Sequence, residues 1–213
     1  MGEFYGIDIS SFNTVVNYDL IAKEQDFVFI RAGGADNKNP YGFYKDRKFE
    51  EYYTQLSKRY VALGAYYLAA AKFFTPEDGR IQAQNFLGLL RGKNFTMPVV
   101  LDLEVPLSGN QKQVTDASIA FLETLEKHGY YAMIYASDIS GFIERLELNR
   151  LNPFDKWVAR YGAGPKNAVP FGIWQYSSTG RVPGINGNVD MNRTTRDYPA
   201  IIKSAGLNHL EKR

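Results

Sequence analysis

Short apolar runs alternate with helical patterns along most of the chain, and this alternation restricts the fold more than any other feature. Runs of β-branched and aromatic residues predict strands over residues 4–7, 27–30, 61–70, 98–104, 130–135, 156–160, 172–176 and 189–191. Helical spacing predicts helices over residues 18–24, 48–58, 75–90, 115–128, 138–146 and 199–205. Such alternation is typical of α/β proteins, so we expect a single-domain, irregular, flattened β/α barrel with mostly parallel strands.

Local signals indicate where the helices begin and where regular structure stops. Asn17 is a suitable N-cap for the first helix, and Thr75, followed by a proline and two acids, is a strong helix start. Thr115 is the expected start of the helix that stops at Gly129. Residues 177–188 are expected to form a long polar loop, and residues 207–213 a polar, frayed tail.

Two carboxylates stand near the end of the predicted strand Pro-Val-Val-Leu-Asp-Leu-Glu-Val-Pro. Asp102 and Glu104 are two residues apart, so their side chains point to the same face of a strand. Each disfavours ionisation of the other, and burial acts in the same direction. Such a pair can supply a general acid, as in the cleavage of glycosidic bonds, although spacing alone fits a structural acid pair equally well.

Four acids in total lie at or just past the ends of predicted strands: Asp8, Asp102, Glu104 and Asp190. In a parallel barrel these ends converge on one face, where active sites are built. Buried carboxylates are costly, so a cluster of four indicates either chemistry or a bound cation. All-oxygen ligands suit magnesium or calcium, but no spacing here matches a cation-binding loop. Asp8 and Asp190 each have a structural alternative, in a turn or bonded to loop amides.

Other candidate site residues lie on the same predicted strands. Arg31 follows the second strand, where it would either neutralise an acid or contact a substrate. Tyr66 and Tyr135 are strand residues that fit either the core or a ligand cleft. Trp174 fits either packing or a platform for a sugar ring.

The composition excludes several other classes of protein. The 213 residues have a net charge of +2 with scattered Lys and Arg, which argues against nucleic-acid binding. Cysteine is absent, and the two histidines, His128 and His209, are too far apart in sequence to suggest a zinc site. No apolar stretch is long enough to span a membrane, and the chain does not open with a signal segment. We therefore expect a monomer with no cofactor, no metal and no membrane or nucleic-acid partner.

The motifs in their order resemble the glycoside hydrolase family 25 lysozymes, the N-acetylmuramidases typified by phage endolysins. Similar to that family are the segments Gly6-Ile7-Asp8-Ile9-Ser10, Phe29-Ile30-Arg31-Ala32-Gly33, Gly64-Ala65-Tyr66-Tyr67, Leu101-Asp102-Leu103-Glu104, Ile134-Tyr135, Trp157-Val158-Ala159-Arg160-Tyr161, Trp174-Gln175-Tyr176-Ser177-Ser178 and Gly184-Ile185-Asn186-Gly187-Asn188-Val189-Asp190-Met191-Asn192. Each segment alone is weak, but their joint order and spacing are specific. The resemblance covers residues 5–193.

The resemblance implies a catalytic barrel over residues 1–206 that cleaves the β-1,4 bond from N-acetylmuramic acid to N-acetylglucosamine in bacterial peptidoglycan. Glu104 would be the general acid, protonated through burial and through Asp102, which assists it. Asp8 and Asp190 would complete the acids of the catalytic face. The expected substrate-binding residues are Tyr66, Arg31, Tyr135, Trp174 and Gln175.

Some residues depart from the family pattern, and two other functions compete. Asn13 stands where Gln or His is frequent, and Tyr67 replaces a frequent His, which puts substrate contacts and the pH optimum in doubt. A chitinase-like hydrolase also uses Asp-x-Glu, but residues 96–100 lack the Asp-Gly-x-Asp run that precedes it there. A non-catalytic wall-binding protein on the same fold is the second alternative. Without a signal segment, we expect synthesis in the host cytoplasm and action on the bacterial wall after release, as for a phage endolysin.

Overall fold

A closed barrel forms the centre of the protein in the computed structural model, which describes residues 2–37, 39, 42–69, 72–104, 108–162, 164–165 and 169–210. Around the barrel the order of strands is β1 (Phe4–Ile9), β11 (Val189–Thr194), β9 (Ile173–Gly180), β8 (Asp155–Ala159), β7 (Ala132–Ser137), β6 (Val99–Asp102), β5 (Ala62–Leu68) and β3 (Phe27–Ala35). Pairing of β3 with β1 closes the ring. This arrangement confirms the α/β barrel expected from the sequence.

The barrel is irregular because its last strand runs against its neighbours. The pairs from β1 through β3, β5, β6, β7 and β8 to β9 are parallel, whereas β11 is antiparallel to both β9 and β1. Two short additions flank this ring. Strand β4 (Phe43–Lys45) pairs antiparallel with the end of β3, and β2 (Thr14–Val15) pairs with β10 (Ile185–Asn186).

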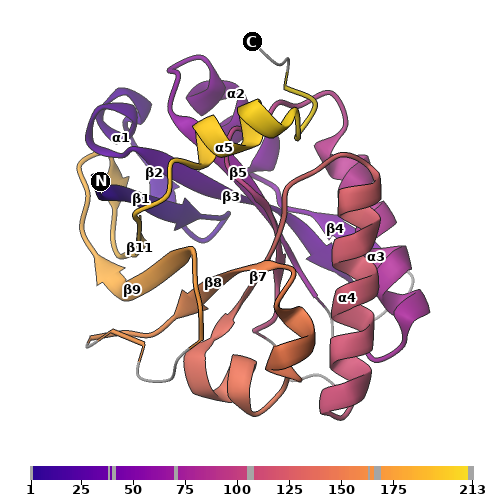
Figure 1. Ribbon diagram of the computed structural model, residues 1–213. Helices are drawn as coiled ribbons and strands as arrows, with labels where there is room; N and C mark the ends of the chain where they lie inside the picture. Colours follow the sequence, from indigo (N-terminus) through magenta and orange to yellow (C-terminus); the bar gives the residue numbers. More distant parts are fainter. Residues whose placement is uncertain are drawn as a thin grey trace.

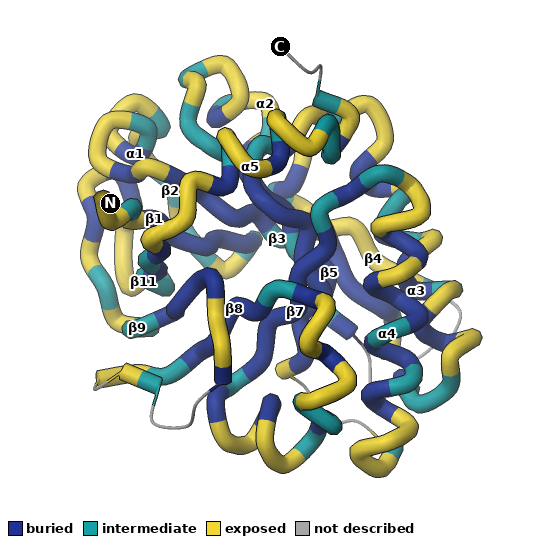
Figure 2. Tube along the Cα trace, viewed as in Figure 1, coloured by how far each residue is buried: buried dark blue, intermediate teal, exposed yellow. Residues whose placement is uncertain are grey.

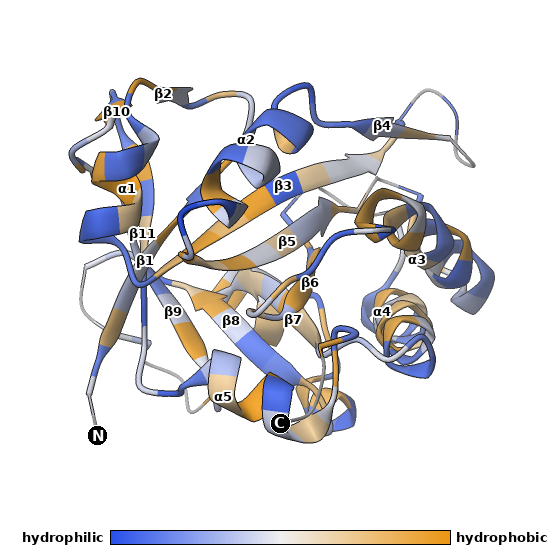
Figure 3. Ribbon diagram, turned by 90° about the horizontal axis from the view of Figure 1, so that it is seen from above, coloured by the Kyte–Doolittle hydropathy of each residue, from blue (hydrophilic) through white to orange (hydrophobic). Residues whose placement is uncertain are grey.

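Helices cover the barrel unevenly. They are α1 (Tyr18–Glu24), α2 (Phe49–Ser57), α3 (Pro76–Leu90), α4 (Gln111–Lys127) and α5 (Tyr198–Ala205), with a π-helix over Asp138–Ile143 and a 3₁₀ turn over Leu148–Leu151. The long helices α3 and α4 lie side by side on one flank, whereas α5 lies across one end of the barrel (Figures 1 and 3). Helices α3 and α4 approach closely at Gly79, where a Cβ atom would lie 2.1 Å from the Ala117 carbonyl oxygen.

Two of the three predicted helix starts are confirmed. The Asn17 side chain accepts hydrogen bonds from the backbone of α1, and Thr75 forms a capping box at the start of α3. The start at Thr115 is wrong, because α4 begins at Gln111, four residues earlier, after a capping box formed by Asn110 and Gln113. Thr115 is instead buried inside α4, where its hydroxyl donates to the Gln111 carbonyl oxygen.

The strand alternation divides the apolar residues into two layers. Inward side chains, including those of Phe29, Val100 and Trp157, fill the barrel. Outward side chains, including those of Val99 and Leu101, pack beneath the helices. The barrel strands are therefore buried on both faces, as Figure 2 shows.

Two expectations for the last part of the chain are wrong. Residues 177–188 are not one loop, because β9 continues to Gly180 and β10 follows. The chain beyond Gly206 packs against the barrel as far as it is described, and Asn208 is fully buried. The Asn208 amide donates to the carbonyl oxygens of Phe95 and Met97, and its oxygen accepts from the Tyr131 backbone. Residues 211–213 lie outside the described residues.

Candidate active site

A cavity of about 250 Å³ opens at the carboxyl ends of the parallel strands. This is the end of a β/α barrel at which loops and strand termini build active sites. All four acids predicted from the sequence line it. The full lining is Asp8, Ser10, Phe12, Asn13, Arg31, Tyr66, Leu68, Asp102, Glu104, Tyr135, Trp157, Asn188, Val189 and Asp190.

Asp102 and Glu104 share the cavity, as their spacing predicts, but they differ in exposure. Strand β6 ends at Asp102, whose side chain is buried inside the barrel, and Glu104 follows two residues later in an exposed position. The expected burial of Glu104 is therefore wrong, because β6 ends at Asp102 and Glu104 lies beyond the strand in an exposed position.

The barrel interior favours the neutral form of Asp102. Burial raises the pKa of its carboxyl well above the usual range, and the charge of Glu104 raises it further. The Oδ1 atom of Asp102 is buried and accepts no hydrogen bond within the described part of the chain. An unpartnered polar atom of this kind is costly unless a ligand satisfies it.

Asp8 is held by two amide side chains from the strands beside it. Its Oδ2 accepts hydrogen bonds from Gln175 Nε2 at 2.9 Å and from Asn192 Nδ2 at 2.8 Å. Burial and the charge of Asp190 nevertheless raise the pKa of Asp8 to about 8. Asp8 therefore keeps its proton at neutral pH.

Asp190 is less buried than Asp8 and faces it across the antiparallel pair of β1 and β11. Burial and the charge of Glu104 raise the pKa of Asp190, whereas a hydrogen bond with Asp8 lowers it. Asp8, Asp102 and Asp190 thus titrate as an interacting group, and together they carry fewer negative charges than their number implies.

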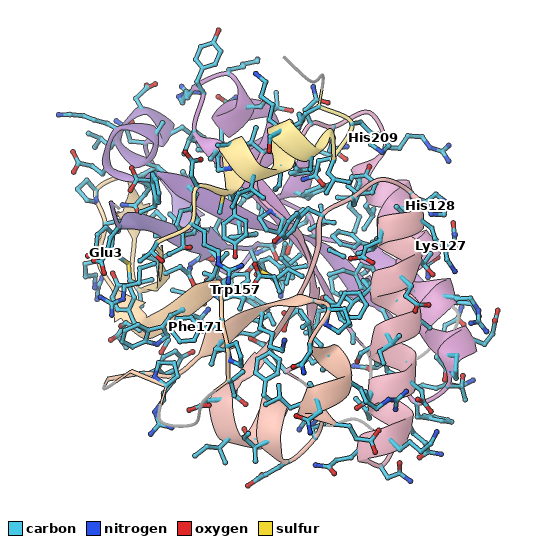
Figure 4. All side chains as sticks on the ribbon, in the orientation of Figure 1. Glu3, Lys127, His128, Trp157, Phe171 and His209 are labelled. Atoms are coloured by element: carbon cyan, nitrogen blue, oxygen red, sulfur yellow. The ribbon has the colours of Figure 1, made fainter. Side chains whose placement is uncertain are left out.

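Aromatic side chains form the inner wall of the cavity. The Trp157 ring lies 4.6 Å from that of Phe29 and 4.8 Å from that of Tyr135, and its Nε1 donates to Asn192 Oδ1 at 2.8 Å. Figure 4 shows Trp157 at the centre of the barrel, with both histidines at the periphery. Tyr66 and Tyr135 line the cavity as expected, and both also pack against Trp157.

Arg31 lines the cavity, but its guanidinium forms an ion pair with Asp46, an acid that the sequence analysis does not identify. Its guanidinium binds the buried Asp46 at 2.8 Å, and it lies 4.9 Å from the centre of the exposed Phe12 ring. Asp46 also accepts from the Ser11 and Lys48 backbone. No strand-end signal marks Asp46, because it follows the short edge strand β4 rather than a barrel strand.

Trp174 and Gln175 occupy different positions from those expected of substrate-binding residues. Trp174 points outward from β9, where its Nε1 donates to the Arg160 carbonyl oxygen and Arg193 lies over its ring at 4.3 Å. Gln175 points inward but is 2% exposed, and its oxygen accepts hydrogen bonds from the hydroxyls of Tyr135 and Tyr161. Gln175 therefore positions Asp8, and Trp174 packs on the outside of the barrel.

Sequence reasoning also missed Trp157 and Asn192 as residues of the site. Both were visible in motifs, and Asn192 lies two residues after Asp190, on the same face of its strand. In the described part of the chain, no group of three or more His, Cys, Asp or Glu is arranged to hold a metal ion. No helix among those residues is long and apolar enough to cross a membrane.

A β/α barrel with a carboxylate cluster and aromatic walls at its carboxyl end has the architecture of a glycoside hydrolase. Comparison with known families then specifies which one. The model of the glycosyl hydrolases family 25 matches residues 7–185, so the chain belongs to that family. The resemblance and the enzyme class predicted from the sequence are thereby confirmed.

Individual relatives agree with this assignment. Lysozyme M1 of Streptomyces globisporus is 28% identical over 206 residues, which cover 88% of this chain and 66% of that protein. The catalytic domain of endolysin ply40, from bacteriophage P40 of Listeria monocytogenes, is 26% identical, with a TM-score of 0.74 and coverage of 94% and 97% of the two chains. The CTP1L endolysin is also 26% identical, with a TM-score of 0.78 over 96% of this chain and 70% of that one. The chain thus spans about two thirds of lysozyme M1.

Proposed function

We propose that this protein hydrolyses peptidoglycan by cleaving the β-1,4 bond from N-acetylmuramic acid to N-acetylglucosamine. The observation that carries the proposal is the convergence of Asp8, Asp102, Glu104 and Asp190 on one cavity at the carboxyl end of the barrel. Family membership and the likeness to a lysozyme and two endolysins support the substrate class. The same likeness supports a role in bacterial lysis.

In the proposed reaction Glu104 is the general acid. It lies at the exposed mouth of the cavity, where a glycan chain can reach it. The glycosidic bond breaks, its electron pair passes to the leaving oxygen, and that oxygen takes the proton of Glu104. Burial, and after it the charge of Glu104, raise the pKa of Asp102, so Asp102 holds a proton beside Glu104 that can replace the one given to the leaving oxygen.

The buried carboxyls respond to the positive charge that develops on the anomeric carbon. In the empty cavity burial favours their neutral forms. A developing cation beside them favours the ionised form of Asp102, whose proton passes to Glu104 as Glu104 gives its own to the leaving oxygen, so stabilisation appears chiefly in the transition state. A nucleophile then adds to the anomeric carbon. It is either water, with Asp102 acting directly, or first the N-acetyl oxygen of the substrate, oriented by Asp102 and then displaced by water; in both routes the water gives a proton back to Glu104 as Glu104 returns one to Asp102.

The competing function is a wall-binding protein without activity, and replacement of Glu104 separates the two. We expect Glu104→Gln to reduce release of soluble fragments from purified walls by about 10²- to 10⁴-fold, the usual contribution of a general acid. Binding to the walls should persist, because the exposed side chain is replaced by one of equal size. Glu123→Gln, an exposed substitution on α4, is the matched control and should keep full activity.

The outcomes distinguish the functions clearly. Wall lysis by Glu104→Gln at a near-normal rate would refute the assignment of the acid. Wild-type protein that pellets with several kinds of wall but releases no fragments would refute the enzymatic function altogether.

A further inference from the structure

A second cavity, of about 400 Å³, lies beside the acid cluster. Its lining is Leu103, Glu104, Tyr135, Ser137, Ser140, Ala159, Arg160 and Tyr161. Glu104 and Tyr135 also line the first cavity, so these two residues form the boundary between the cavities. Asp8, Asp102 and Asp190 all lie on the other side of that boundary.

Tyr161 presents an aromatic ring in a fixed position on the second cavity. The residue is 54% exposed, so a ligand in the cavity can reach its ring. Its hydroxyl donates to Gln175 Oε1 at 3.1 Å, and the same Gln175 donates to Asp8. The ring is therefore held in place by the polar network that also orders the acids.

The rest of the second cavity offers hydrogen-bonding groups that are also held in place. Arg160 Nη1 donates to Asp138 Oδ2 at 2.8 Å, which anchors the guanidinium at the cavity wall. Ser137 and Ser140 share a hydrogen bond of 2.6 Å between their hydroxyl oxygens. An aromatic face beside fixed hydroxyl and guanidinium donors suits a neutral ligand with an apolar face and several acceptor oxygens, which describes a hexosamine ring.

We infer that the second cavity binds the leaving sugar, an N-acetylated hexosamine, and that Tyr161 is its stacking platform. This inference rests on the proposed function. The sugar that becomes cationic belongs beside the buried carboxyls, and the leaving oxygen belongs beside Glu104. Since Glu104 stands on the boundary, the leaving sugar extends to the side of Tyr161. The glycan therefore crosses the barrel mouth in one direction only.

The test compares two substrates that differ only in their leaving group. One is a soluble muramic acid–glucosamine oligosaccharide, and the other is the β-fluoride of N-acetylmuramic acid, whose leaving group is a fluoride ion with nothing to stack. We expect Tyr161→Ala to reduce kcat/KM about tenfold on the oligosaccharide, the size of effect expected for a lost aromatic contact, and to leave cleavage of the fluoride nearly unchanged.

Two further variants show whether the ring itself is responsible. Tyr161→Phe keeps the ring and removes the hydroxyl that binds Gln175, so its loss of oligosaccharide cleavage should be much smaller than that of Tyr161→Ala. Tyr60→Ala removes a still more exposed tyrosine two residues before β5, at the opposite end of the barrel, and should change neither rate.

Equal losses on both substrates with Tyr161→Ala would overturn the inference, because the tyrosine would then act only through Gln175 and Asp8. Unchanged cleavage of the oligosaccharide would overturn it as well. A wild-type protein that cleaves neither substrate would refute the proposed function instead. In that case chemical-shift changes of the Tyr161 ring on addition of N-acetylglucosamine oligomers would still support the binding site, and their absence would refute it.

Discussion

Replacement of Asp8 by asparagine should make the protein more stable as the pH rises, relative to the wild type. Asp8 is an acid whose pKa is raised from 3.8 to about 8 in the folded protein. Between these two values the unfolded chain has lost the proton and the folded chain keeps it. The wild type therefore loses stability as the pH rises through this window, by about 1.4 kcal/mol per pH unit from this residue.

The structure indicates that asparagine can replace the neutral carboxyl without loss of its hydrogen bonds. The amide oxygen can accept from Gln175 and Asn192, as Asp8 Oδ2 does now. The amide nitrogen can donate to Asp190, in place of the Asp8 proton. The variant thus keeps the geometry of the neutral form and no longer titrates.

Urea denaturation at about pH 4.5 and about pH 7.5 gives the magnitude. Over these three pH units the stability of Asp8→Asn relative to the wild type should rise by about 4 kcal/mol. Asp116→Asn is the control, because hydrogen bonds and charge from Lys112 and Arg150 lower the pKa of the partly buried Asp116 and place its titration below this window. A stability difference for Asp8→Asn that does not grow with pH would refute the reasoning that Asp8 is protonated in the folded state.

Two further substitutions test the supports of the site. Asp46→Asn leaves the half-buried Arg31 without its anion, so we expect a loss of about 3–5 kcal/mol in urea denaturation, and a loss below 1 kcal/mol would contradict a structural ion pair. Asn208→Ala removes a buried amide that closes the end of the barrel, so we expect a loss of about 1–3 kcal/mol, and unchanged stability would show that residues beyond Gly206 do not support the fold.

The acid pair shows how far strand periodicity alone can predict a site. The period of two places Asp102 and Glu104 on one face, and the structure confirms that both line the same cavity. Periodicity does not reveal where a strand ends, however. The period therefore predicts burial of Glu104, whereas the strand ends at Asp102 and buries that acid instead.

Other errors arose where tertiary contacts decide the outcome. On β9 the side chain of Gln175 points into the barrel and hydrogen-bonds Asp8, whereas that of Trp174 points outward. The sequence around them does not indicate which of the two faces the barrel interior. The pairing of β1 with β11 places Asp8 opposite Asp190, although the two residues stand near opposite ends of the chain. Asp46 and Asn208 act through contacts with distant residues, so local patterns could not identify them.

The central claim is that this protein cleaves the bond on the muramic acid side of the glycan repeat, and reducing-end analysis tests it most directly. Purified peptidoglycan would be digested with the protein, reduced with borohydride and examined by mass spectrometry. The proposed function predicts fragments that end in reduced N-acetylmuramic acid. Fragments that end in reduced N-acetylglucosamine would keep the hydrolase but contradict the assignment of the bond.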